Sequence, residues 1–303
     1  MKPIKPNQII VAIKDSKIDY DCRRLNLTPR RLFRFYARSG YPPAKIENIE
    51  AIHELQQQGK KVLHDLIDSD RIISRSSINP ALLRQQKLVL AFGGDNHFQC
   101  VARYLTDTPI LGINTDPPRS EGALTQITVN QLAATLHNLE RGNYSIKKWT
   151  RLAVTLQGKP LPFPGLCEAY IGEHRVENMS RLSIQHGQER FLHKGSGMLI
   201  YTGSGSTGWA HSVERQVRPG QVYFDTTSAY LRYLCMHPYV GKLSPAPLDP
   251  RMRLRNGQEM LITSMNDAEG VIILDALEVY PFPEGSIASI RTGPNLKVIV
   301  TQL

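Results

Sequence analysis

Two glycines and an aspartate follow a short apolar run, and this stretch is the first candidate for chemistry. Residues 88–92 are all apolar, and Gly93, Gly94 and Asp95 come directly after them. An apolar run that ends at glycines is typical of a strand buried on both faces. Because open α/β sheets bind ligands at the carboxyl ends of their strands, Asp95 is expected at a ligand-facing edge. The simpler alternative is that Asp95 only caps the turn between this strand and a helix.

A second polar segment follows the next apolar run. Residues 109–113 are predicted to form a buried strand, and the loop 114–122 follows it with the sequence NTDPPRSEG. A helix at 97–105 is expected between the two strands, and this order of elements predicts an open parallel sheet. The charged side chains of the loop either pair with one another or, in the case of Arg119, neutralise a phosphate.

A third candidate is rich in glycine and hydroxyl groups. Residues 203–208 read GSGSTG after the apolar run 198–201, which fits the GxGxxG pattern of dinucleotide-binding folds, with Asp225 as the acidic partner. The pattern comes late in the chain, after a segment of short strands, whereas such folds begin with it. The alternatives are a flexible loop or a cradle of backbone N–H groups around a phosphate or ribose. The cradle would lead into a helix that begins near Thr207.

The elements that must position these residues divide the chain into two parts. Up to about residue 145, apolar runs alternate with helical patterns; from 146 onward, short apolar runs recur between turns. We predict an open parallel α/β domain at 1–145 and a β-rich, β-sandwich-like domain at 146–303, whose last strand returns to the first domain. First-domain strands are expected at 9–13 and 72–73, and helices at 28–38, 49–66 and 129–140. Second-domain strands are expected at 149–156, 167–171, 182–184, 197–201, 252–254, 260–262, 271–274, 287–290 and 297–300.

Composition narrows the class of partner. The 303 residues include 37 basic and 27 acidic side chains, a net charge of +10, which favours anionic partners. Basic residues never form a run longer than two, so we expect phosphorylated small molecules and neither nucleic acid nor membrane. The four cysteines lie far apart, which predicts no metal site and a reducing, cytoplasmic compartment. His97, His211 and His237 are expected to be surface or loop histidines and not ligands.

These motifs, in this order, resemble the NAD kinase family, and most closely its animal mitochondrial type. Residues 112–122 (GINTDPPRSEG) are similar to that type's GVNTDPxRSEG segment. Residues 196–209 (SGMLIYTGSGSTGW) are similar to its SGLxxxTGTGSxxW segment, and 285–289 (GSIAS) to its GAIAS. The resemblance extends from about residue 9 to residue 300, and the first of these segments is its most specific part.

The resemblance implies a protein that uses ATP to phosphorylate the 2′-hydroxyl of the adenosine ribose of NAD, giving NADP. Asp95 would accept the proton of that hydroxyl, and Mg²⁺ would neutralise the triphosphate. Glu168 would bind ribose hydroxyls, Trp209 would stack on a ring of the dinucleotide, and the chain would form a homodimer or homotetramer. The binding residues implied are Gly93, Gly94, Asn96, Asn114, Arg119, Cys167, Glu168, Thr202, Gly203, Ser204, Thr207, Gly208, Trp209 and Ser212.

The chain departs from the family pattern at two of these positions. Asn96 replaces the last glycine of Gly-Gly-Asp-Gly, and Cys167 replaces the amide of an Asn-Glu pair. Asparagine tolerates left-handed backbone, but its side chain would extend toward the phosphates, and a thiol replaces an amide poorly. The alternative is therefore a catalytically impaired member that binds NAD(H). A related kinase that acts on a lipid is disfavoured, because no membrane-binding feature is present in the sequence.

Overall fold

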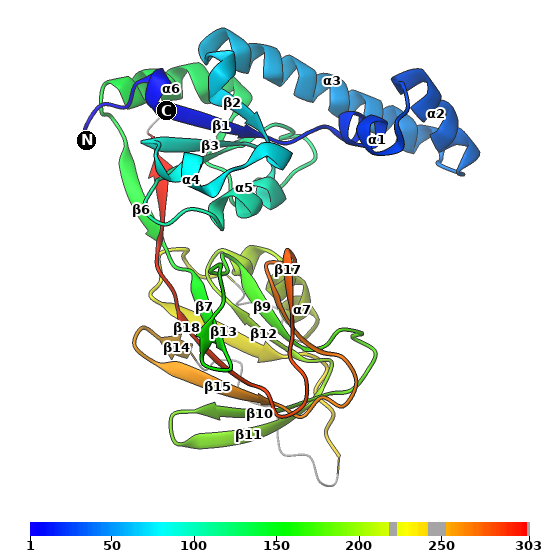
Figure 1. Cartoon of the computed structure of the whole chain (residues 1–303), viewed down its shortest axis with the longest axis vertical. Coiled ribbons are helices and arrows are strands. Elements are labelled where there is room, and N and C mark those ends of the chain that lie inside the picture. Colours follow the sequence, from blue (N-terminus) through cyan, green and yellow to red (C-terminus); the bar gives the residue numbers. More distant parts are fainter. Residues whose placement is uncertain (218–222, 242–252, 302–303) are drawn as a thin grey trace. The chain divides into compact units, whose positions relative to one another are not determined.

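The computed structural model describes residues 1–217, 223–241 and 253–301. The chain forms two compact units, which are described separately below (Figure 1). Unit 1 consists of Met1–Val101, Asp107–Ile146 and Val298–Leu303, and unit 2 of Ala102–Thr106 and Lys147–Lys297. Met252, the expected start of one strand, lies outside the described residues.

A mainly parallel sheet forms the centre of unit 1. Its strands are β1 (Ile9–Ile13), β2 (Ile72–Ser74), β3 (Leu88–Gly93), β4 (Ile110–Asn114), β5 (Ile127–Thr128), β6 (Ser145–Trp149) and β19 (Leu296–Val300). The order is β2-β1-β3-β4-β19-β6, with β5 beside β4. β1 pairs in parallel with β2 and β3, and β4 pairs in parallel with β3, β5 and β19. The predicted parallel α/β sheet is thus confirmed, and β3 and β4 are buried at every residue.

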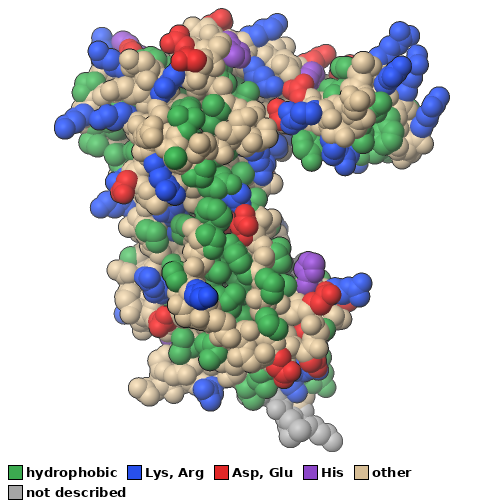
Figure 2. All heavy atoms as spheres, in the orientation of Figure 1, with side chains coloured by type: hydrophobic (Ala, Val, Ile, Leu, Met, Phe, Trp, Pro, Cys, Tyr) green, Lys and Arg blue, Asp and Glu red, His purple; other side chains and the backbone are tan. Residues whose placement is uncertain are grey.

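The helices of unit 1 include two, at 17–25 and 80–84, that the sequence patterns did not predict. Ser16 accepts a hydrogen bond from the backbone N–H of Asp19 and so caps the extra helix α1, which ends at Asn26 in left-handed backbone. α1, α2 and α3 share a small core of their own around Leu32 and Tyr36. Lys and Arg side chains gather on this helical arm (Figure 2). The helices are α1 (Lys17–Leu25), α2 (Pro29–Arg38), α3 (Pro43–Leu66), α4 (Pro80–Arg84), α5 (Asp95–Ala102) and α6 (Leu132–Glu140).

Two antiparallel sheets form unit 2. One has the order β11-β10-β15-β18-β7-β8 and the other β14-β13-β12-β9-β16-β17. The strands of the first are β7 (Leu152–Leu156), β8 (Lys159–Pro160), β10 (Ser180–His186), β11 (Glu189–Gly195), β15 (Glu259–Ser264) and β18 (Ile287–Thr292). Those of the second are β9 (Glu168–Glu173), β12 (Met198–Tyr201), β13 (Tyr230–Cys235), β14 (Arg253–Arg255), β16 (Gly270–Leu274) and β17 (Glu278–Pro281).

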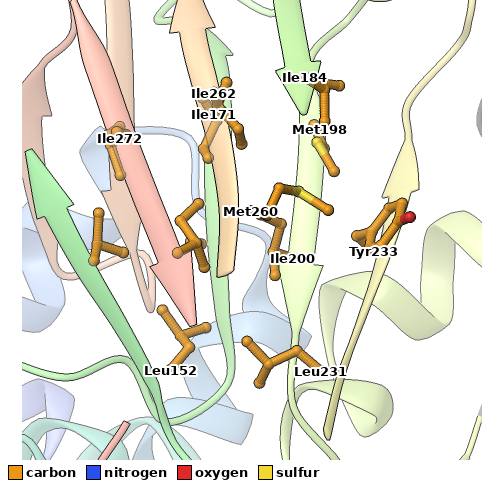
Figure 3. Packing of buried hydrophobic residues seen from close by; sticks show 14 of the residues in the cluster. Leu152, Ile171, Ile184, Met198, Ile200, Leu231, Tyr233, Met260, Ile262 and Ile272 are labelled. Carbon is orange, nitrogen blue, oxygen red and sulfur yellow. The ribbon is translucent and has the colours of Figure 1, made fainter. Parts of the chain in front are cut away.

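The two sheets of unit 2 enclose one apolar core, as the β-rich prediction required. Met260 and Ile262 on one sheet pack in the same cluster as Ile171, Ile200 and Ile272 on the other (Figure 3). Buried and more exposed residues alternate along β15, because only one face of that strand meets the core. β9 is buried at every residue, since α7 (Trp209–Val217) covers its second face through a separate apolar cluster.

One expected strand is interrupted. The apolar run at 149–156 forms the end of β6 and all of β7, and the chain leaves strand geometry at Thr150 and Arg151. Arg151 is completely buried, and its guanidinium donates to the carbonyl oxygens of Pro294 and Leu105 at 2.7 and 2.8 Å. The break therefore serves to place a cation among backbone acceptors. Among the described residues, no helix has the length and apolar character needed to cross a membrane.

Candidate functional site

Asp95 is held at the carboxyl edge of the unit 1 sheet by a neighbouring loop. It is the first residue of α5, two residues after Gly93, the glycine that ends β3. Its Oδ1 accepts a hydrogen bond from the backbone N–H of Leu124 at 2.9 Å, and its Oδ2 accepts one from Ala123 at 3.0 Å. These two bonds fix the carboxylate, and each oxygen keeps a further lone pair for another proton donor. Asp95 therefore anchors the loop after β4, beyond any role in capping its own turn.

The two glycines before Asp95 provide space, and neither has a positive φ. A Cβ on Gly93 would lie 2.8 Å from the Cβ of His97, which is too close. A Cβ on Gly94 would lie 3.4 Å from Ser120 Oγ, an ordinary contact. Gly93 is thus required by packing inside the protein, whereas a side chain at Gly94 would meet only an ordinary contact.

His97 is fully buried, which corrects the expectation of a surface or loop histidine. Its Nε2 lies 2.8 Å from the carbonyl oxygen of Ala12, which can only accept, so Nε2 carries the proton. Burial lowers the pKa of His97 to about 4, and the ring is neutral at physiological pH. His97 therefore supports the Gly93 turn from beneath.

Asn96 is exposed and lies inside the first turn of α5. It is absent from the residues with positive φ, so the left-handed backbone that was considered for it is not adopted. Glycine's conformational freedom is therefore not needed here, and the substitution affects only the side chain presented at the surface.

Asn114 shapes the loop that reaches Asp95. This residue ends β4 and is buried; its Oδ1 accepts from the backbone N–H of Asp116 at 3.0 Å, and its Nδ2 donates to Ser120 O at 3.3 Å. Arg119 pairs with Asp116 at 2.9 Å and donates through Nε to Asn48 Oδ1 at 2.8 Å. The internal ion pair expected for the loop is thus present between Arg119 and Asp116, and the phosphate-binding role of Arg119 stays a prediction.

A second cluster lies in unit 2, where β9 begins. The buried carboxylate of Asp275 accepts three backbone N–H groups, from Leu166 at 2.7 Å, Cys167 at 2.8 Å and Glu168 at 3.1 Å. Asp275 itself has a φ of 56°, in the left-handed region that Asp enters more readily than most residues. The chain is thus ordered around Cys167 and Glu168 by an acidic side chain from the end of β16.

Glu168 is a buried carboxyl whose second oxygen lacks a partner. It is 8% exposed, and within the described part of the chain its Oε2 makes no hydrogen bond. Burial, and then the charge of Asp275, raise the pKa of Glu168 to about 8. A Cβ placed on Gly208 would lie 3.9 Å from this Oε2, so the carboxyl faces the glycine-rich loop. Such a group at neutral pH can both donate and accept a hydrogen bond.

The glycine-rich loop packs on the same backbone. Thr202 Oγ1 donates to Leu166 O at 2.6 Å and accepts from the N–H of Gly205 at 3.2 Å. A Cβ on Gly205 would lie 2.1 Å from Cys167 O, and one on Gly203 would lie 2.2 Å from Asp225 O. Only glycine fits at these two positions, because neighbouring backbone oxygens fill the space that a side chain would need. Ser204 is buried, and its Oγ has no hydrogen-bond partner among the described residues.

The helix expected near Thr207 begins slightly later. A short 3-10 turn (Gly205–Thr207) precedes α7, and the exposed Thr207, Gly208 and Ser212 lie at its start. The Trp209 ring stacks on Tyr170, with 5.4 Å between ring centroids. β12, which leads into the loop, has antiparallel neighbours on both sides. The dinucleotide-fold interpretation of GxGxxG, which needs a parallel sheet, is therefore wrong.

The described residues contain no group of three or more His, Cys, Asp or Glu side chains placed to hold a metal ion.

The sequence is similar to those of known NAD kinases. The chain is 26% identical over 207 residues to an NAD kinase of Thermoplasma volcanium, covering 67% of this chain and 69% of that protein. It is 23% identical over 266 residues to human mitochondrial NAD kinase 2, covering 70% of this chain and 59% of the human protein. No protein-family model matches the chain.

Solved structures share the fold. An NAD kinase from Archaeoglobus fulgidus in complex with ATP superposes with a TM-score of 0.61 at 13% identity, covering 97% of this chain and 93% of that one. Yeast NADH kinase complexed with NADH superposes with a TM-score of 0.66 at 12% identity, covering 100% and 85%. Both matches extend over the α/β unit and the β-rich unit together.

Proposed function

We propose that this chain, which belongs to the NAD kinase family, transfers the γ-phosphoryl group of ATP to the adenosine-ribose 2′-hydroxyl of NAD and so produces NADP. The observation that carries the assignment within the chain is Asp95. It is a half-exposed carboxylate at the carboxyl edge of a parallel sheet, and two backbone N–H groups hold it. Gly94, where a Cβ would fit without a clash, precedes it in the chain.

Asp95 has the chemistry that the acceptor hydroxyl needs. A secondary alcohol is a weak nucleophile, and a carboxylate within hydrogen-bond reach aligns it and takes its proton. In the transfer, the 2′-oxygen forms a bond to the γ-phosphorus and the bond from that phosphorus to the β–γ bridging oxygen breaks. ADP leaves, and the hydroxyl proton passes to Asp95. Because Ala123 and Leu124 hold both carboxylate oxygens, Asp95 is oriented before the substrate arrives.

Mg²⁺ fits this scheme as a companion of ATP. The ion prefers oxygen ligands and usually keeps several waters while bridging substrate phosphates. We propose that it enters with the triphosphate, since the described residues offer no metal cluster of their own. When bound, it would neutralise charge on the phosphoryl oxygens.

The unit 2 cluster is suited to nucleoside recognition. Glu168 offers a buried carboxyl with an unused oxygen, and Ser204 offers an unused hydroxyl. Ribose hydroxyls both donate and accept hydrogen bonds, as these two groups do. We propose Gly208, which lies beside Glu168, and Thr207 and Ser212, which are exposed with it at the start of α7, as further substrate contacts.

The test is production of NADP by the purified protein. The protein is incubated with ATP, Mg²⁺ and either NAD or NADH, and a dehydrogenase specific for NADP measures the product. Tight calorimetric binding of NAD without any NADP would identify the impaired, NAD(H)-binding alternative. In that case, recovery of turnover in a variant that combines Asn96→Gly and Cys167→Asn would show that those two departures cause the impairment.

Two further properties are proposed, an oligomeric state that the resemblance implies and a location that the cysteine pattern suggests. We propose a homodimer or homotetramer, to be measured by light scattering coupled to size-exclusion chromatography. We also propose a cytoplasmic location, which is the compartment expected for a chain whose four cysteines lie far apart in the sequence. Localisation of the tagged protein in its own host would test it.

A further inference from the structure

Two cations follow neighbouring strand ends in the unit 1 sheet. In the registers of β1 with β2 and β3, the last shared row consists of Ser74, Ile13 and Phe92. The residues that come next in the three strands are Arg75, Lys14 and Gly93. The backbone N–H of Lys14 donates to Phe92 O at 3.1 Å, which continues the β1–β3 pairing past the row. Arg75 and Lys14 therefore stand in line with the turn that leads to Asp95.

A cavity of about 530 Å³ opens at these strand ends. The other charges that face it are already balanced: Asp15 pairs with Arg23 at 2.5 Å, and Lys17 pairs with Asp21 at 2.6 Å. The lining of the cavity therefore carries a net positive charge, because its one carboxylate, Asp15, is paired with Arg23, which does not line the cavity. Its lining residues are Lys14, Asp15, Ser16, Lys17, Tyr20 and Arg75.

Lys14 and Arg75 form no ion pair with any carboxylate in the described parts of the chain. Both side chains line the same cavity, and partial desolvation and then the charge of Arg75 lower the pKa of Lys14. Two like charges that line one cavity without a counter-ion raise the free energy of the unliganded protein. An anion placed between them would remove that repulsion and gain charge-assisted hydrogen bonds.

We propose that this cavity binds the phosphate chain of the phosphoryl donor, with Lys14 and Arg75 contacting its non-bridging oxygens. The inference rests on the proposed function and extends it, because it places the donor on the β1–β2 side of the Asp95 turn. Arginine's planar fork suits two oxygens of one phosphate, and lysine supplies a mobile point charge. Both charges stabilise the negative charge that accumulates on the departing diphosphate. Lys17, tied to Asp21, contributes a weaker field.

Direct binding tests the site without catalysis. Calorimetry measures the Kd of ATP and, separately, of inorganic tripolyphosphate for the wild type, Lys14→Gln, Arg75→Gln and the double variant. Each single change is expected to weaken both ligands by about tenfold, and the double change by more, because charged hydrogen bonds are lost. Lys61→Gln and Arg84→Gln remove exposed cations of the same unit and serve as matched controls. If the double variant binds tripolyphosphate as tightly as these controls do, the site is disproved.

Kinetics separate this inference from the proposed function. In the double variant, KM for ATP is expected to rise at least tenfold while KM for NAD and the melting temperature stay at wild-type values. If the double variant produces NADP with an unchanged KM for ATP, the proposed donor site is rejected and the proposed function stands. A wild type that makes no NADP, yet binds tripolyphosphate only when Lys14 and Arg75 are present, would remove the function and leave the anion site.

Discussion

Glu168 and Asp275 are joined by two reciprocal hydrogen bonds. The backbone N–H of Asp275 donates to Glu168 O at 3.0 Å, and the backbone N–H of Glu168 donates to Asp275 Oδ1 at 3.1 Å. The pair locks the end of β16 to the start of β9. Burial of the Glu168 carboxyl, and then the charge of the neighbouring Asp275, raise the pKa of Glu168 to about 8, so it holds its proton at neutral pH.

Asp275→Ala is expected to destabilise the protein by about 3 kcal/mol or more, because three backbone N–H groups at 166–168 lose their acceptor in a buried place. Asp275→Asn keeps one acceptor oxygen and should cost less. Urea unfolding measures both, with the exposed Asp65→Ala as control. Equal stability of Asp275→Ala and the control would show that solvent satisfies these groups.

Glu168 should make stability fall as the pH rises. Its pKa is raised from 4.5 to about 8, so between these values the native state holds a proton that the unfolded state releases. The free energy of unfolding should therefore decrease by on the order of 2 kcal/mol from pH 6 to pH 8 relative to Glu168→Gln, and level off above pH 8. Denaturant titrations of both proteins across this range provide the measurement. Parallel pH profiles would contradict the raised pKa.

Substitution of the glycines in the 203–208 loop should have two different effects, a loss of stability where the glycine is needed for packing and a rise in KM where it lies beside the ligand. Gly205→Ala puts a Cβ 2.1 Å from Cys167 O and is expected to cost about 3 kcal/mol of stability or prevent folding. Gly208→Ala meets no atom closer than 3.7 Å, so stability should change little while KM for NAD rises several-fold. Thermal melts and kinetics of the pair distinguish the two effects. An unaltered KM in Gly208→Ala would argue against a ligand at this loop.

Asp95→Asn should abolish turnover while the fold persists. The amide keeps one acceptor oxygen, so only one of the two loop hydrogen bonds is lost, at a cost of about 1 kcal/mol. The rate of NADP formation is expected to fall by roughly 10²- to 10⁴-fold, the range for a lost general base. Asp65→Asn is the matched control. Turnover near the wild-type level would exclude Asp95 as the base.

Asn96→Gly should not raise the rate. Asn96 lies in ordinary helical backbone, so glycine relieves no strain there and weakens the first turn of α5 by about 1 kcal/mol. We expect kcat within about twofold of the wild type. A large gain would mean that the exposed amide obstructs a substrate, as the family's glycine at this position suggests.

Much of the fold was predictable because the signals are local. The runs at 88–92 and 109–113 are strands in the structure, since an apolar stretch that ends at polar or glycine residues can be buried in a sheet whatever its partners are. α2 begins at Pro29 for a similarly local reason. α1 was not predicted, although Ile18, Cys22 and Leu25 recur at helical spacing and pack in one apolar cluster, and Ser16 and Asn26 mark the two ends of the helix.

Glycine spacing could not reveal which glycines serve a ligand. A Cβ would clash with His97 at Gly93, with the backbone of Asp225 at Gly203 and with the backbone of Cys167 at Gly205. A Cβ at Gly94 or Gly208 would meet no atom closer than 3.4 Å. That division depends on contacts between segments far apart in the chain.

The sequence by itself determined the two kinds of sheet, the loops that follow β3 and β4, and the resemblance that assigns a reaction to Asp95. Only the tertiary structure decided how Asp95 is oriented, that Glu168 is paired with Asp275, and that Lys14 and Arg75 line one cavity. The physical reason is register. The pairing of β1 with β2 and β3 sets which side chains meet beyond the strand ends, and that pairing is a long-range property that no single segment encodes.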